Sequence, residues 1–308
     1  MNKIVAICGP TAVGKTAYSI EIAKKFDGEI VSCDSMQLYK YMDIGSAKPS
    51  SDELNQVKHH LIGVVEPSEM FSVAKYKELA NEAIDDIISR GKLPIIAGGT
   101  GLYLDALLYD LDFAAAPSDD SLRDELYKIA EEKGNLELHA ILQECDPSSA
   151  KRIHPNNVRR VVRAIESAKS GVHLKDFAKD LSLNDKYEFI LIGLRRDREE
   201  LYDRINRRVD VLVKEGLFEE VKMLREMGLS ESDISMKGIG YKEVLAYFDG
   251  EYDLETAIDT IKKNTRHFAK RQITWLKRYD DMKWFDLSES KDDKDSIREI
   301  ITWLEKNL

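Results

Sequence analysis

The chain of 308 residues is poor in cysteine and has no long hydrophobic run. Its three cysteines, Cys8, Cys33 and Cys145, lie far apart, without a C-x-x-C pair or a Cys/His grouping. This spacing argues against a zinc site and a disulfide framework, so we expect Cys8 and Cys33 to be buried thiols. No apolar run approaches the roughly 20 residues that cross a bilayer, and the N-terminus lacks the pattern of a signal segment. We therefore expect a cytoplasmic protein with no membrane partner.

The chain also lacks an excess of positive charge. Its formal net charge is −10, from 46 lysines and arginines against 56 aspartates and glutamates. Such a balance ordinarily counts against a nucleic-acid partner, so RNA binding must depend on where the basic residues lie. A hydrophobic content of 43% and a charged content of 33% are those of an ordinary soluble protein. The length allows one large domain or two modest ones.

The strongest motif is GPTAVGKT, which follows the apolar run 3–8 and precedes apolar residues at helical spacing. Strand, glycine loop and helix are the context in which G-x-x-x-x-G-K-[ST] forms a phosphate-binding loop, or P-loop. Backbone N–H groups and the helix N-terminus hold the phosphate, Lys15 adds a charge, and the Thr16 hydroxyl helps to hold Mg2+. The alternative is a glycine-rich turn without a ligand. The predicted diphosphate-binding residues are Gly9, Pro10, Thr11, Ala12, Val13, Gly14, Lys15 and Thr16.

A second buried strand is predicted over 29–32, and it leads directly into Asp34. The C-terminal ends of parallel strands share one crevice, so we expect Asp34 to lie close to the phosphates. The alternative role of Asp34 is to cap a turn or helix. Residues 39–49 have no clear period and predict a loop that lines the crevice, with Asp43, Gly45, Ser46 and Lys48 as candidates. A further strand is predicted over 61–65, after a His pair that we interpret as structural.

The strand predicted over 92–97 follows an amphipathic helix at 72–90 and ends in Gly98-Gly99-Thr100. In an ATP-hydrolysing P-loop enzyme, we would expect such a strand to end in an Asp that helps to hold Mg2+. Two glycines allow a backbone to approach a ligand closely, and Thr100 offers a hydroxyl without charge. This pattern favours a protein that binds a diphosphate without being an NTPase.

The predicted fold class is α/β: a P-loop core with a parallel sheet flanked by helices, plus an inserted all-helical domain. After a linker-like segment at 114–118, helices are predicted over 119–133, 135–144 and 156–170, and a strand resumes at 187–194. We therefore expect a core of 1–114 with 191–308 and an insertion of 115–190. The insertion carries a basic cluster that is either a solvated face or a contact surface for a phosphate backbone. Its members are Lys151, Arg152, His154, Arg159, Arg160 and Arg163.

Helices are also predicted over 197–214, with Arg204, Arg207 and Arg208 beside its apolar face, and around 255–278. No acidic residue lies between Thr260 and Tyr279, although the chain as a whole is acidic. The basic residues there are Lys262, Lys263, Arg266, Lys270, Arg271, Lys277 and Arg278. Because Gln272, Thr274 and Trp275 are interleaved with them, this segment resembles a basic groove for RNA. The alternative is a plain amphipathic helix.

Taken together and in order, the motifs resemble those of the bacterial tRNA dimethylallyltransferases, also called tRNA isopentenyltransferases. The motifs are GPTAVGKT, CDSMQLYKYMDIGSAKP, the His pair, IIAGGTGLY, HPNNVRRVVRAIE, LYDRINRRVD, KGIGYKE and TRHFAKRQITWLKR. The resemblance covers nearly the whole chain except the acidic tail after Lys283. It implies transfer of a dimethylallyl group from dimethylallyl diphosphate to N6 of the adenosine 3′-adjacent to the anticodon, with Mg2+. It also implies the tRNA anticodon stem-loop as partner, and we expect a monomer with no protein partner.

The resemblance further implies roles for single residues. Asp34 would be the general base at the adenine amine, Thr100 would contact the flipped adenosine, and Arg208 would neutralise the leaving diphosphate, with Arg204 as the alternative. Thr16 would be the metal ligand. The implied tRNA-binding residues are Asp34, Ser35, Met36, Gln37, Thr100, Arg123, Arg159, Arg160, Arg163, Lys270, Arg271, Gln272 and Trp275. Two other functions stay open at this point: a small-molecule kinase that uses ATP, and an RNA-binding P-loop module without chemistry.

Overall fold

A computed structural model describes residues 1–109, 111, 120–171, 182–290 and 292–308. The chain forms two compact units, one made of Met1–Tyr109 with Leu183–Leu308 and the other of Asp110–Ser182. These bounds lie a few residues before the predicted domain limits at both ends of the insertion. The linker predicted at 114–118 lies outside the described residues.

A six-stranded parallel sheet forms the centre of the first unit, with the order β3-β2-β4-β1-β5-β6. The strands are β1 (Asn2–Cys8), β2 (Gly28–Cys33), β3 (His59–His60), β4 (Leu93–Gly98), β5 (Tyr187–Arg195) and β6 (Lys283–Asp286). In the three central strands, Cys8 pairs with Gly98, and Gly98 pairs with Cys33. The C-terminal ends of β1, β4 and β2 therefore lie at one level, as expected for an α/β protein.

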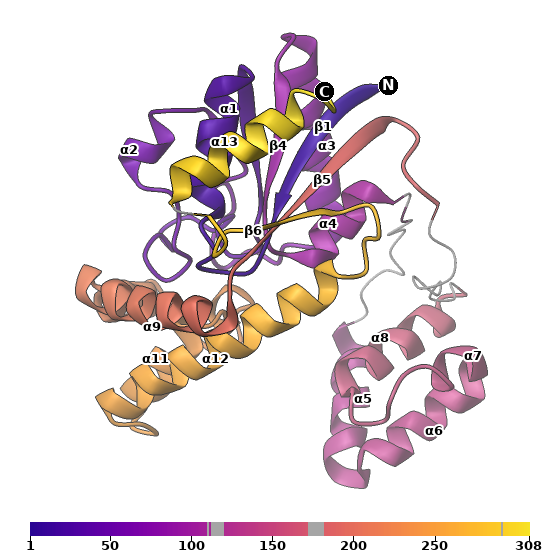
Figure 1. The fold of residues 1–308 in the computed structure, drawn as a ribbon. Coiled ribbons are helices and arrows are strands. Elements are labelled where there is room, and N and C mark those ends of the chain that lie inside the picture. The colour runs from indigo at the N-terminus through magenta and orange to yellow at the C-terminus, as the bar shows by residue number, and fades with distance from the viewer. Residues whose placement is uncertain (110, 112–119, 172–181, 291) are drawn as a thin grey trace. The chain divides into compact units, whose positions relative to one another are not determined.

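Helices cover both faces of this sheet, which confirms the predicted fold class (Figure 1). The helices are α1 (Lys15–Lys25) and α13 (Asp293–Leu304), which share one hydrophobic core, and α3 (Val73–Ser89) and α4 (Gly101–Leu108), which share the other. Alternate side chains of β1 enter the two cores: Val5 and Ile7 join the first, and Ile4 and Ala6 the second. A strand buried on both faces is apolar throughout, and this explains the run at 3–8.

Further helices lie beyond the C-terminal ends of the strands (Figure 1). They are α9 (Arg198–Glu215), α10 (Leu217–Glu226), α11 (Tyr241–Phe248) and α12 (Leu254–Leu276). Gly216 ends α9 at φ 107°, a left-handed conformation that glycine adopts without strain. The buried stripe of α12 has helical spacing and consists of Ala257, Ile261, Ala269, Gln272 and Leu276. The short helices α2 (Ser51–Leu54) and η1 (Ser235–Lys237) complete the described elements of this unit.

One sequence prediction differs from the structure. The strand predicted over 61–65 is wrong, because Leu61 and Gly63 have φ near +60° and turn the chain; only His59–His60 forms a strand there, followed by a single bridge from Val65 to Tyr39. At the C-terminus, β6 extends the sheet and α13 packs beside α1. The sequence analysis places these residues in the core but predicts no strand or helix for them.

The second unit contains α5 (Asp120–Lys133), α6 (Asn135–Cys145), α7 (Pro147–Ala150) and α8 (Val158–Lys169), which include the predicted helices. Its own core is made of Leu126, Leu138, Leu142, Val161 and Ile165, among others. Among the helices of the described residues, none has the length and apolar character needed to cross a bilayer.

Candidate active site

A cavity of about 700 Å3 lies in the first unit, at the C-terminal ends of the strands. That volume falls in the usual range for small-molecule sites, roughly 300–1,000 Å3. The predicted site residues that line it are Thr11, Ala12, Gly14, Lys15, Thr16, Asp34, Ser35, Met36, Gln37, Arg208, Arg271 and Gln272. The predicted residues of this unit that do not line it are Gly9, Pro10, Val13, Thr100, Lys270 and Trp275. The fold thus brings most of the predicted site together.

The P-loop connects β1 to α1 and opens into this cavity. Gly14 is the N-cap of α1 at φ 116°, where a side chain would be strained, and it offers no side chain that could cap the first N–H groups of the helix. Lys15 Nζ donates to the carbonyl of Pro10 at 2.9 Å, and so its amine lies over the loop. A helix N-terminus with free N–H groups and a lysine beside it is suited to a multiply charged anion.

Two arginines hold the P-loop from outside the cavity. Arg204 Nε donates to the carbonyl of Ala12 at 3.0 Å, and Arg196 Nε donates to that of Val13 at 3.1 Å. Arg196 is itself paired with Glu200 and with Asp293 of α13, at 2.7 Å each. Because Arg208 lines the cavity and Arg204 does not, the structure favours Arg208 as the arginine that would face a ligand in the cavity.

The cations of the cavity are destabilised by their surroundings. Burial lowers the pKa of Lys15 to about 8, with Arg208 adding to the effect and Asp34 opposing it. Burial also lowers the pKa of Arg208, against the opposing charges of Glu53 and Asp34. The Arg208 side chain stays accessible to solvent through the cavity, where its Nη2 donates to the carbonyl of Ala47 at 3.3 Å. Burial disfavours the charged forms of Lys15 and Arg208. An anion bound between these groups would stabilise those charged forms.

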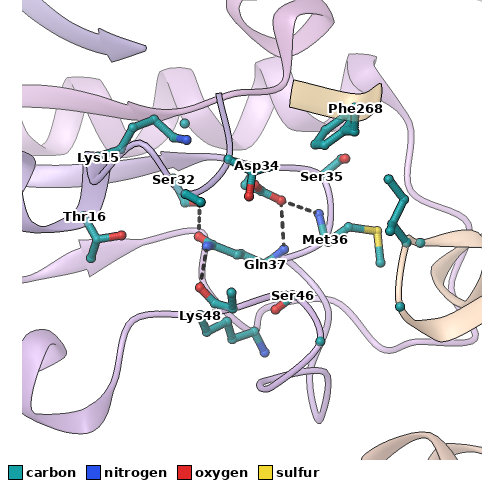
Figure 2. Close-up of a pocket in the computed structure, with 18 of the residues that line it drawn as sticks. Lys15, Thr16, Ser32, Asp34, Ser35, Met36, Gln37, Ser46, Lys48 and Phe268 are labelled. Atoms are coloured by element: carbon teal, nitrogen blue, oxygen red, sulfur yellow. Dashed lines mark hydrogen bonds between the residues drawn. The ribbon is translucent and has the colours of Figure 1, made fainter. Parts of the chain in front are cut away.

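Asp34 follows β2 and combines two roles that the sequence left as alternatives. Its Oδ1 accepts from the N–H groups of Met36 and Gln37, at 2.9 and 3.4 Å, as a turn cap does (Figure 2). Among the described residues, no hydrogen bond reaches Oδ2, and the side chain lines the same cavity as Lys15 and Thr16. Gln37 extends the link, because its Nε2 donates to the carbonyl of Ala47 at 3.2 Å. The cap therefore orients the carboxylate and leaves one oxygen for a ligand.

The segment Gly98–Thr100 supports this loop from behind. Thr100 Oγ1 accepts from the N–H of Ser35 at 3.1 Å, so it touches the Asp34 loop without lining the cavity. A Cβ added at Gly98 would lie 2.1 Å from the carbonyl oxygen of Cys33, and one at Gly99 would lie 2.2 Å from Gln272 Nε2. Both glycines thus allow neighbouring protein atoms to approach closely, and Gly98 also lines the cavity; the interpretation that they admit a ligand stays a prediction.

A buried glutamate that the sequence analysis missed holds the loop 43–49. The carboxylate of Glu220, on α10, accepts from the N–H groups of Asp43, Ile44 and Gly45 at 2.7, 2.7 and 2.9 Å, and from Tyr241 Oη at 2.8 Å. This loop lines the cavity with residues 45–49, as predicted for a loop along the crevice. In sequence, Glu220 resembles any acidic residue in a first helical turn, and only the tertiary fold reveals its partners.

The outward face of α12 is basic and carries a second cavity of about 590 Å3. Its lining residues are His267, Lys270, Arg271, Thr274, Trp275 and Arg278. The guanidinium of Arg278 lies 4.8 Å from the centre of the Trp275 ring, in cation–π geometry. Gln272 differs from these residues, because only 5% of its surface is exposed and its amide bonds inside the protein. That Gln272 contacts tRNA stays a prediction, and the structure gives its amide other partners.

In the second unit, the basic residues of α8 divide into two groups. Arg163 pairs with the buried carboxylate of Glu166 at 3.2 Å, and Arg123 of α5 pairs with the same carboxylate at 2.7 Å. Arg159 and Arg160 are exposed. The two arginines on Glu166 therefore have a structural function inside this unit, while Arg159 and Arg160 point their charge outward.

Two places could be considered for a metal ion. The described residues bring Glu29, His60 and Asp86 together, but Arg90 binds both carboxylates, so this group is an ion-pair cluster. In the cavity, the Thr16 hydroxyl lies beside the P-loop, and a hydroxyl next to the oxygens of a bound diphosphate fits Mg2+, which prefers oxygen ligands.

A P-loop sequence after the first strand of a parallel sheet, with cations facing a cavity at the strand ends, is the arrangement of the P-loop class of proteins. The model of the IPP transferase family matches residues 37–279, and the chain belongs to this family. A tRNA dimethylallyltransferase of Clostridioides difficile strain 630 is 50% identical over the full length of both chains. One from Alkaliphilus metalliredigens strain QYMF is 51% identical, over 100% of this chain and 97% of the relative.

Solved structures agree with this assignment. The tRNA isopentenylpyrophosphate transferase of Bacillus halodurans has a TM-score of 0.75 and 44% identity, covering 99% of this chain and 96% of the other. A eukaryotic dimethylallyltransferase, captured acting on tRNA, has a TM-score of 0.84 and 30% identity, covering 100% of this chain and 80% of the other.

Proposed function

We propose that this protein transfers a dimethylallyl group from dimethylallyl diphosphate to N6 of the adenosine 3′-adjacent to the anticodon of tRNAs, releasing diphosphate. Its family membership and relatives of the same activity over the full chain length support the proposal. The observation that carries it is one cavity that joins a P-loop to Asp34, with Arg208 beside them and the basic helix α12 at its edge.

The donor is expected to bind with its diphosphate on the P-loop. The N–H groups at the start of α1, together with Lys15 and Arg208, match the negative charge that grows on the diphosphate as its C–O bond breaks. Mg2+, held by the Thr16 hydroxyl and diphosphate oxygens, would supply additional charge stabilisation there. A bound diphosphate would bring negative charge next to both cations and so offset the burial that lowers their pKa values.

The acceptor is expected to reach Asp34 from the side of α12. The adenine leaves its stack so that N6 can enter the cavity, as in other base-modifying enzymes. Asp34 Oδ2 then orients the amine and accepts its proton, while the C–N bond forms and the C–O bond breaks. Lys270, Arg271 and Trp275 offer charge and a stacking surface for the RNA, and Arg159 and Arg160 offer charge on the second unit.

The proposal is tested by incubating the protein with dimethylallyl diphosphate, Mg2+ and a tRNA pool, followed by mass spectrometry of the nucleosides. We expect an adenosine that gains one dimethylallyl unit, and no such product without the donor. No gain across a full tRNA pool would refute the proposal.

The two alternatives have their own signatures in the same experiment. A kinase would transfer label from the γ-phosphate of ATP to a metabolite and leave tRNA unmodified. A binding module without chemistry would retain tRNA without producing a modified nucleoside. The end of β4 in Gly98, with no acidic residue there, is the feature of this site that disfavours the kinase.

A further inference from the structure

Gln272 is a polar residue in the buried stripe of α12. It shares this inward face with Ala269 and Leu276, three residues before it and four after it, and only 5% of its surface is exposed. Burying an amide is costly unless each of its polar atoms finds a partner, and an apolar side chain would pack against these neighbours at lower cost. The presence of glutamine at this position therefore calls for a polar role.

Both ends of this amide are occupied, and each contacts a different loop of the site. Oε1 accepts from the N–H of Thr11 in the P-loop at 2.8 Å, and Nε2 donates to the carbonyl of Gly99 at 3.0 Å. The partners determine the orientation of the amide, since only its oxygen can accept from an N–H and only its nitrogen can donate to a carbonyl. A Cβ at position 99 would lie 2.2 Å from Nε2, so this approach requires a residue without a side chain, as glycine is.

The two loops that Gln272 joins serve the two sides of the proposed reaction. The P-loop carries Lys15 and Thr16 for the diphosphate. The loop at Gly99 continues into Thr100, whose Oγ1 holds the N–H of Ser35 beside Asp34. One side chain thus connects the expected binding site of the donor to the support of the group that faces the acceptor.

We propose that Gln272 is a positioning residue that holds the P-loop and the Gly98–Thr100 segment in the relative arrangement that transfer requires. The inference rests on the proposed function. In-line transfer needs the prenyl carbon and N6 within near-attack distance, and a displacement of about 1 Å can cost about 10²-fold in rate. Gln272 lines the cavity, but both polar ends of its amide are engaged with protein atoms, so it acts through alignment.

The test is Gln272→Met, which keeps the volume and removes both hydrogen bonds. We expect kcat to fall at least about tenfold, with the KM values for donor and tRNA within about threefold of wild type, because each loop keeps its own binding groups and only the placement of the two loops relative to each other changes. Gln272→Glu keeps the acceptor for Thr11 and loses the donor to Gly99. We expect its kcat to lie between those of the wild type and Gln272→Met. The matched control is Gln143→Met on α6, an exposed glutamine of the second unit, which should behave as wild type.

A second readout does not depend on activity. The amide proton of Thr11 should exchange slowly with solvent in the wild type and in Gln272→Glu, and fast in Gln272→Met. A variant that were merely less stable would melt at a lower temperature but keep the kcat of wild type per folded molecule.

The outcomes separate the inference from the function. Wild-type kcat in folded Gln272→Met, or in Gln272→Glu if the first variant does not fold, would overturn the inference while leaving the proposed function intact. Absence of transfer by the wild-type protein would overturn the proposed function and, with it, this inference.

Discussion

Glu220→Gln should destabilise the protein strongly, although it changes only one atom of the side chain. Only 7% of the surface of Glu220 is exposed, and its carboxylate accepts four hydrogen bonds, two on each oxygen. In either orientation of a glutamine amide, its NH2 group faces at least one backbone N–H, which then loses its acceptor. The hydrogen bonds that remain also lose the negative charge that strengthens them.

The magnitude follows from these contacts. A buried donor without an acceptor costs about 1–3 kcal/mol, and a bond to a charged acceptor is worth roughly 1 kcal/mol more than a neutral one. One lost donor and two weakened bonds therefore add up to about 4 kcal/mol. For a unit of this size, each kcal/mol corresponds to about 2–4 °C, so we expect the melting temperature to fall by roughly 10 °C.

Thermal unfolding followed by far-UV circular dichroism measures this change. The matched control is Glu219→Gln, an exposed glutamate next to it on α10, for which we expect less than about 0.5 kcal/mol. Tyr241→Phe removes one of the four bonds and should cost about 1 kcal/mol. If Glu220→Gln had the same melting temperature as Glu219→Gln, the reasoning would be refuted, because the loop 43–49 would then not depend on this carboxylate.

Three further predictions concern catalysis, RNA binding and acid stability. Asp34→Asn keeps the turn cap and removes the base, so transfer should fall about 10²-fold or more while tRNA binding is retained; transfer at the wild-type rate would exclude the base role. Arg271→Ala should weaken tRNA binding and lower the slope of log K against log salt by about 1, as filter binding at several salt concentrations would measure, and an unchanged slope would remove Arg271 from the contact surface. Hydrogen bonds from Arg90 lower the pKa of Glu29 from 4.5 to about 2, so the ionised side chain stabilises the fold fully above about pH 4.5, and this contribution is lost as the pH falls toward 2. The difference in unfolding free energy between pH 7 and pH 3, from urea titrations, should shrink by about 2 kcal/mol in Glu29→Gln, and an equal difference in both proteins would contradict the assignment.

The parts of the site that depend on local sequence could be predicted. GPTAVGKT between an apolar strand and a helix is a local pattern, and the structure forms β1, loop and α1 at those residues. The position of Asp34 followed from a general rule, since the C-terminal ends of parallel strands share one crevice. The helical spacing of apolar residues likewise predicted α3 and α9 to within a residue or two at each end.

Other features could not be predicted because their causes lie far away in the chain. The role of Gln272 depends on contacts with Thr11 and Gly99, which lie 261 and 173 residues before it. Its helical phase was a usable signal, because it stands in register with the apolar residues of α12, but the basic residues around it suggested RNA instead. The strand β6 has four residues, too few for a period, and its formation depends on the exposed edge of β5.

The pairing of Cys8, Gly98 and Cys33 has a consequence for the reach of the enzyme. The P-loop begins after Cys8 and the Asp34 loop begins after Cys33, and the single strand β4 separates the two starting points. Adjacent strands lie about 4.8 Å apart, so the sheet sets the separation of these two starting points at about 10 Å. Substitutions in the P-loop or the Asp34 loop can change how the side chains of these loops point, but they cannot change this spacing. The gap that a transferred group must bridge is therefore limited by the spacing of the backbone itself.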